Sequence, residues 1–290
     1  MLQKDKKDVI ISLFDFTPEA EVALNHASKI AEQAHDEVRL LHIINAETKT
    51  KLKKAHEGDE AIFQKLKEIS EKNYKDTNVP TTYHAEAGSI FTKVGKYVKE
   101  SEASLVVFGT HGVHGMQHIV GANSLKLILS CPVPVVVVQK KKADYYGYKK
   151  IVLPIDHTKF GKNKTAFAIS MAKDFGGEII IFESLEKDPH LTHTIKNNVN
   201  YAAGLLKSAN VPFSHCTEDP AKGNFAKQVI KHSAEVSADL IVITSQQDMN
   251  SIGDFIFGNN EIEVINNDAQ IAVMCVNPVQ NTNLSISGIN

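Results

Sequence analysis

The chain has 290 residues, 42% of them hydrophobic and 23% charged, with a formal net charge of -2 at pH 7. This composition is that of a globular protein with material for two domains, and its near-neutral charge excludes a strong general attraction to nucleic acid or to an anionic membrane. Arg39 is the only arginine in the sequence, so extensive bidentate guanidinium contacts to DNA are also excluded.

The N-terminal segment predicts a buried strand followed by a helix. An apolar run ends just before Asp15, Thr17 suits a helix N-cap, and Pro18 suits the first helical position. Charged residues interrupt the apolar run that a signal peptide would need, and no apolar run approaches the roughly 18 residues of a membrane span. We therefore expect a soluble, cytoplasmic protein.

The most informative stretch covers residues 106–124, VVFGTHGVHGMQHIVGANS. An apolar strand pattern breaks into four glycines and then re-enters a helical pattern, which is how a chain exposes a row of backbone N–H groups to an anion. Glycine lets a phosphate approach the backbone closely. The stretch predicts a phosphate-binding loop, with a tight strand-to-helix connection as the alternative interpretation.

Histidines and cysteines could also indicate a metal or a reactive site. His111, His114 and His118 fall in or just after the glycine-rich stretch, but no cysteine or carboxylate ligand clusters with them, so solvent-facing or phosphate-adjacent histidines are favoured and no metal is predicted. The three cysteines, which form no C-x-x-C pair, are predicted to be small core residues of a protein in a reducing compartment.

The sequence then repeats itself. Asp156 follows a strand pattern in the second half of the chain as Asp15 does in the first, and the later strand patterns of the first half all recur in the second. The matching pairs are 37–44 with 178–184, 103–110 with 238–245, and 131–139 with 269–277. A polar segment at 140–150 suits a linker. These patterns predict domains at 1–140 and 149–280 and a polar tail at 281–290.

Short strands rich in valine and isoleucine alternate with helical patterns in both halves. This order predicts an α/β fold with two tandem, doubly wound domains, each a parallel sheet covered by helices. Ligands of such sheets bind beyond the carboxyl ends of the strands where the strand order reverses. Asp15 and the glycine-rich loop are therefore expected to converge on one crevice.

The sequence resembles the universal stress protein family in its tandem, two-domain form. The resemblance rests on IISLFDFT at 10–17, LLHII at 40–44, GTHG at 109–112 and PVPVVVV at 132–138, and it extends over almost the whole chain. It implies a Rossmann-like, adenine nucleotide alpha hydrolase-like domain with a five-stranded parallel sheet. It also implies that the second domain pairs with the first through their last strands, as a pseudo-dimer partner, with a homodimer as a further expectation.

The resemblance also implies where a nucleotide would bind. Nucleotide-binding members carry the motif G-x2-G-x9-G-[ST], whereas here Gly121 follows Gly112 after eight residues and Ala122 takes the place of the hydroxyl residue, with Asn123 and Ser124 as substitutes. Asp15 would lie near the nucleoside, with Leu13 beside it and the backbone of Ile43 against adenine. The predicted site comprises Leu13, Asp15, Ile43, Gly109, His111, Gly112, Gly115, Gly121, Ala122, Asn123 and Ser124. The alternative for Asp15 is a charge at a helix start.

The second domain is predicted to be degenerate. Gln246 and Gln247 stand where His111 and Gly112 do in the first.

From the resemblance and the glycine-rich loop, we expect a cytoplasmic stress-response or signalling protein. It would bind ATP, AMP or ADP, with Mg²⁺ if a triphosphate is bound, in its N-terminal domain. The alternative is a nucleotide-free interaction module acting through its dimer-like surface. Enzymatic activity would at most be slow ATP hydrolysis.

Overall fold

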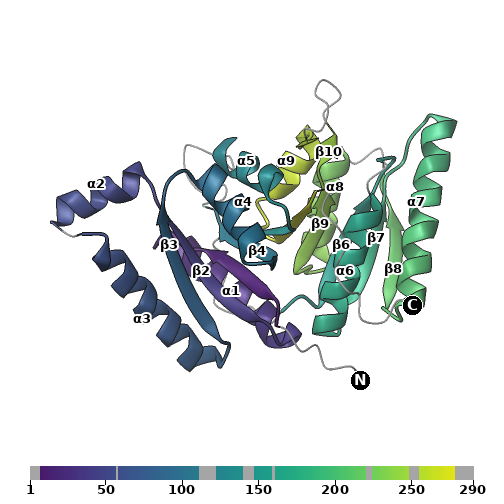
Figure 1. Ribbon diagram of the computed structural model, residues 1–290. Coiled ribbons are helices and arrows are strands. Elements are labelled where there is room, and N and C mark those ends of the chain that lie inside the picture. Colours follow the sequence, from purple (N-terminus) through teal and green to yellow (C-terminus); the bar gives the residue numbers. More distant parts are fainter. Residues whose placement is uncertain are drawn as a thin grey trace. The chain divides into compact units, whose positions relative to one another are not determined.

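A computed structural model describes residues 7–56, 58–110, 122–139, 147–158, 161–219, 224–247 and 255–277. The chain divides into two compact units, the first ending before residue 141 and the second containing all described residues from 147 onward. Each unit is a layer of strands with helices packed against it (Figure 1). Among the described residues, every helix is too short or too polar to span a bilayer.

The first unit contains a five-stranded parallel sheet. Its strands lie in the order β3-β2-β1-β4-β5. The elements are β1 (Val9–Leu13), α1 (Pro18–Ala34), β2 (Glu37–Ile44), α2 (Ala46–Ala55), α3 (Glu60–Thr77), β3 (Thr81–Ala87), α4 (Ile90–Glu100), β4 (Ala103–Gly109), α5 (Ala122–Ser130) and β5 (Val135–Val138).

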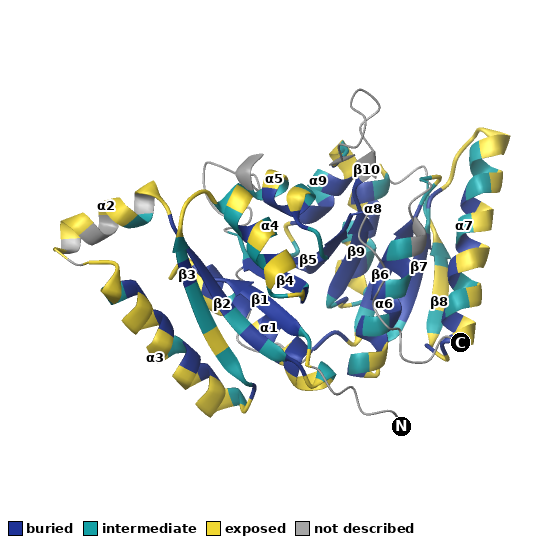
Figure 2. Ribbon diagram, in the orientation of Figure 1, coloured by how far each residue is buried: buried dark blue, intermediate teal, exposed yellow. Residues whose placement is uncertain are grey.

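The first unit's elements form where the local sequence directs them. The central strand β1 is buried along its whole length, whereas the edge strand β3 is largely intermediate or exposed (Figure 2). Helix α1 begins as predicted: Thr17 is its N-cap, accepting a hydrogen bond from the amide of Ala20 at 3.2 Å, and Pro18 is its first residue. The helix ends at Ala34, and its C-cap residue, His35, adopts the left-handed conformation with φ 60°.

The second unit repeats this topology. Its parallel strands lie in the order β12-β9-β6-β7-β8, which corresponds strand for strand to the first unit. The elements are β6 (Lys150–Ile155), α6 (Gly161–Phe175), β7 (Glu178–Glu183), α7 (Pro189–Ser208), β8 (Phe213–Thr217), α8 (Phe225–Glu235), β9 (Leu240–Thr244), β10 (Gln246–Gln247), β11 (Phe255–Ile256), α9 (Asn259–Ile265) and β12 (Ala272–Val276). The predicted fold class, two tandem doubly wound α/β domains with five parallel strands each, is confirmed.

In the second unit, a two-stranded antiparallel sheet follows the fourth strand of the parallel sheet. In the second unit, Gln246 and Gln247 form β10, which pairs in antiparallel fashion with Phe255 and Ile256 of β11. The corresponding glycine-rich segment of the first unit, 111–121, lies outside the described residues. A short hairpin therefore follows β9 where the sequence showed the glycine pattern to be lost.

The cysteines agree only in part with the expectation of three core residues. Cys131 and Cys275 are buried, and burial raises the pKa of the Cys131 thiol to about 12 and that of Cys275 higher still. Cys216 is instead half-buried on β8, with its Sγ 3.4 Å from Nε2 of His232. The prediction that Cys216 is a core residue was wrong because β8 is an edge strand and one of its faces is largely exposed.

Candidate functional site

The candidate site lies at the carboxyl end of the first unit's sheet, between β1 and β4. The chain runs from β1 outward through β2 to β3 and returns on the other side of β1 as β4, so the strand order reverses between these two neighbours. Ser12 of β1 pairs with Val107 of β4, which brings Asp15 and Thr110 to the same edge. This is the position at which doubly wound folds bind ligands.

Asp15 is exposed directly beyond β1, and its carboxylate organises the turn into α1. Its Oδ1 accepts hydrogen bonds from the amide of Thr17 at 3.1 Å and from the Thr17 hydroxyl at 2.5 Å. Thr17 in turn caps α1. Within the described residues, Oδ2 makes no hydrogen bond or ion pair. One carboxylate oxygen thus holds the turn, and the other makes no such contact within the described residues, on an exposed residue at the sheet edge.

Phe16, between these two residues, adopts a left-handed backbone conformation with φ 64°. Non-glycine residues rarely adopt it, and when they do the strain is compensated by their surroundings. The Phe16 ring lies against two neighbours, with its centroid 4.9 Å from that of His42 and 5.5 Å from that of Phe14. Nδ1 of His42 donates to the Phe14 carbonyl at 2.6 Å. This cluster fixes the turn that carries Asp15.

Leu13 and Ile43 are buried, with 9% and 7% of their surface exposed. Their side chains therefore belong to the core of the unit, and only their backbone groups lie near the carboxyl ends of β1 and β2. This is compatible with the predicted use of the Ile43 backbone, which stays a prediction.

Gly109, the last residue of β4, packs directly against the first turn of α1. A Cβ at this position would overlap the backbone carbonyl of Glu19. Close packing of a helix on a strand end thus requires glycine here, irrespective of any ligand. Its predicted contact with a phosphate stays a prediction.

The remaining predicted residues lie in or before α5. Ala122, Asn123 and Ser124 form the first turn of this helix, as the sequence indicated. The amides of a first helical turn have no partner within the helix and favour anions. The other members of the predicted set, His111, Gly112, Gly115 and Gly121, lie outside the described residues.

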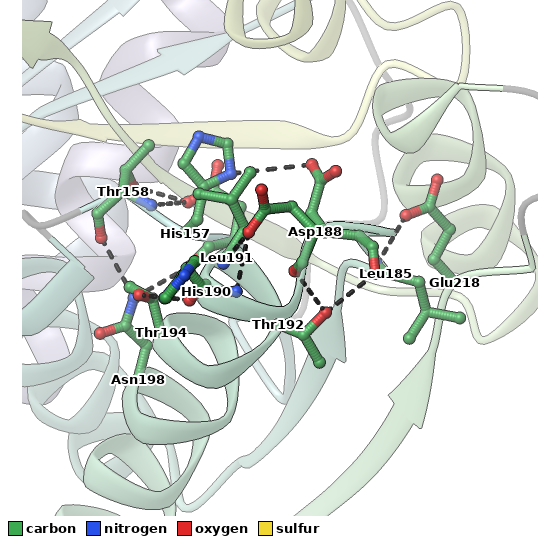
Figure 3. Close-up of polar contacts among 12 residues, drawn as sticks. His157, Thr158, Leu185, Asp188, His190, Leu191, Thr192, Thr194, Asn198 and Glu218 are labelled. Atoms are coloured by element: carbon green, nitrogen blue, oxygen red, sulfur yellow. Dashed lines mark hydrogen bonds and ion pairs between the residues drawn. The ribbon is translucent and has the colours of Figure 1, made fainter.

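The second unit has the same acidic turn. Oδ1 of Asp156 accepts from the amide of Thr158 at 2.9 Å and from its hydroxyl at 2.6 Å. Asn198 of α7 braces this turn, donating to the backbone carbonyls of Asp156 and Thr158 at 2.9 and 3.2 Å (Figure 3). Helix α6 begins only at Gly161, so the role of Asp156 is to shape the turn.

Sequence reasoning missed Lys164, which is buried on α6 with 4% of its surface exposed. Its Nζ donates to the carbonyl of Pro154, near the end of β6, at 2.5 Å. Burial lowers the pKa of this ammonium group, against the opposing effect of the Asp156 and Glu261 carboxylates. Its spacing was a usable signal, because Lys164 lies one helical turn before Ala168, a fully buried residue of the same helix.

Comparison with solved structures defines the fold first. A universal stress protein from Archaeoglobus fulgidus DSM 4304 is 16% identical, with 94% of this chain and 99% of that chain covered and a TM-score of 0.75. A functionally unknown protein from Pseudomonas aeruginosa PAO1 is 14% identical, with 94% and 93% covered and a TM-score of 0.65. At such identities these likenesses show the shared fold alone. A search of curated proteins gave no match.

The family follows from the sequence of the first unit. Residues 8–139 match the model of the universal stress protein family. The first unit is therefore a universal stress protein domain, and the second unit repeats the same fold.

Proposed function

We propose that the first unit binds an adenine nucleotide at the carboxyl end of its sheet and that the bound nucleotide regulates the protein. The observation that carries the proposal is the position of the exposed Asp15 at the edge shared by β1 and β4, where its Oδ1 is held by Thr17 and its Oδ2 makes no hydrogen bond or ion pair within the described residues. ATP, AMP and ADP are the proposed ligands, with Mg²⁺ accompanying a triphosphate.

Each part of a nucleotide would meet a suitable group. Oδ2 of Asp15 is an acceptor for a ribose hydroxyl or a base amine, since an ionised carboxylate only accepts hydrogen bonds. The first turn of α5, with Ala122, Asn123 and Ser124, offers backbone N–H donors to a phosphate. Both groups follow strands that adjoin at the point of reversal, β1 and β4.

The repeat supplies a matched control for the test. Asp15→Asn keeps Oδ1 as acceptor for Thr17 but converts Oδ2 into part of an amide group, and Asp156→Asn makes the same change in the second unit. Calorimetric titration with ATP and with AMP should show affinity reduced by about tenfold or more in Asp15→Asn, the loss expected for a hydrogen bond to a charged group. Asp156→Asn should bind as the unaltered protein does. Equal affinities in all three proteins would overturn the proposal.

A nucleotide-free interaction module is the second candidate function. Ala122 favours it, because this residue begins α5 without a hydroxyl group to add to the phosphate contacts. Mass spectrometry of the protein purified under native conditions distinguishes the two. A co-purified adenine nucleotide supports the first function, whereas its absence together with a null titration supports the second.

We also propose that the protein acts in the cytoplasm as a stress-response or signalling protein. Its three cysteines are all free thiols, as is usual in a reducing compartment. Fractionation of the cells that make the protein would check its location.

A further inference from the structure

Lys164 marks a difference between the two units at equivalent positions. The alignment of the two halves that matches Asp15 with Asp156 also matches Ala23 of α1 with Lys164 of α6. Ala23 is fully buried, and Lys164 is 4% exposed. The same place in the fold therefore holds a methyl group in the first unit and a long side chain ending in an ammonium group in the second.

The ammonium group lies at the second unit's own reversal point, between β6 and β9. Lys164, Asp156 and Glu261 line one pocket there, together with Thr244 at the end of β9 and Phe225 at the start of α8. The Pro154 carbonyl accepts a hydrogen bond from Nζ. Both carboxylates lie close enough to oppose the effect of burial on the pKa of Lys164. A hydrogen bond and nearby opposite charges reduce the large cost of burying an ammonium group.

The space left beside this cluster is small. The pocket has a volume of about 30 Å³, room for one or two water molecules. The acidic turn has been kept in the second unit, but the crevice beside it is filled by a side chain.

We infer that the Lys164 ammonium group is the built-in occupant of the second unit's reversal-point site, where it takes the place of an external ligand between Asp156 and Glu261. The second unit is then a permanently filled counterpart of the first. This inference does not depend on what the first unit binds, because all its groups belong to the second unit.

Chemical rescue tests the inference in the full chain. Lys164→Ala installs the residue that the first unit has at Ala23, leaving space and two carboxylates without their cation. Its melting temperature should fall by roughly 5 °C or more, since the change removes a buried side chain together with its hydrogen bond to Pro154 and the positive charge beside two carboxylates. Methylammonium chloride, compared with sodium chloride at equal ionic strength, should then raise the melting temperature of this variant and leave the unaltered protein unchanged.

Lys164→Met is the matched control, because it fills most of the same space without a charge or a donor. It should melt below the unaltered protein and gain nothing from methylammonium. An Ala variant as stable as the unaltered protein, or one that methylammonium does not stabilise, would overturn the inference.

Competitive labelling of the unaltered protein decides the matter if the variants do not fold. Lysines are acetylated with a trace of acetic anhydride and the rates are compared by peptide mass spectrometry. Lys173, exposed on the same helix, is the internal standard. Lys164 should be acetylated more than tenfold more slowly, and a smaller difference would show that its amine is not held in the site.

Discussion

Gly109 and Glu19 are in such close contact that the end of β4 and the first turn of α1 leave no room for a β-carbon between them. The sequence predicted that Gly109 contacts a phosphate, whereas the structure shows that its packing against Glu19 requires glycine whether or not a ligand is bound. The two explanations make different predictions for a single substitution.

Gly109→Ala should destabilise the protein by about 1 to 3 kcal/mol, the usual cost of overpacking, because the backbone of Glu19 must move. Urea unfolding measures the change. Gly204→Ala is the control: Gly204 lies within α7 with open space around it, so this change should stabilise by up to about 1 kcal/mol. Unaltered stability in Gly109→Ala would contradict the packing explanation.

Thr17→Ala should cost about 1 kcal/mol of stability, because it removes the N-cap of α1 and the hydroxyl that donates to Asp15. The comparison is Thr158→Ala, in which the hydroxyl bond to Asp156 is lost and the helix α6 begins three residues further on, at Gly161. In thermal unfolding, Thr17→Ala should have a lower melting temperature than Thr158→Ala. The reverse order would show that capping is not what Thr17 contributes.

His26 should make the stability depend on pH. Burial lowers its pKa from 6.5 to about 4, so the unfolded chain binds the proton more tightly than the folded one. Stability is then fully present above pH 6.5 and is lost as the pH falls toward 4, by about 2 kcal/mol between pH 7 and pH 5.

Urea unfolding of the unaltered protein and of His26→Gln at both pH values measures this loss. The Gln variant lacks the titrating group, so most of the loss on acidification should disappear in it. His193→Gln, at an exposed position of α7, should behave as the unaltered protein does. A pH dependence that is the same in all three proteins would assign it to other groups.

Nucleotide titration should saturate at one molecule per chain. The first unit carries the proposed site, and the second has its corresponding place filled by Lys164. Equilibrium dialysis with labelled AMP would count the bound molecules. Two per chain would contradict the inference about Lys164, whereas none would contradict the proposed nucleotide site and leave that inference intact.

Residues whose interactions are local could be predicted from the sequence, whereas residues whose contacts are distant in the chain could not. Asp15, Thr17 and Pro18 were placed correctly as a strand-end turn and a helix start, because their interactions join near neighbours in the chain. Gly109 and Lys164 were not understood from sequence. Gly109 packs against Glu19 from the start of the same unit, and Lys164 lines one pocket with Glu261 from near the end of its own, so both relationships join residues far apart in the chain.

By itself, the sequence determined the alternation of strands and helices, the duplication of one unit in two halves and the acidic turn that closes the first strand of each half, because periodicity and local hydrogen bonding are properties of neighbouring residues. Only the tertiary structure decided that Gly109 is required by packing and that a lysine fills the second crevice. Both depend on which distant side chains the two sheets bring to their carboxyl edges, and no local pattern records that arrangement.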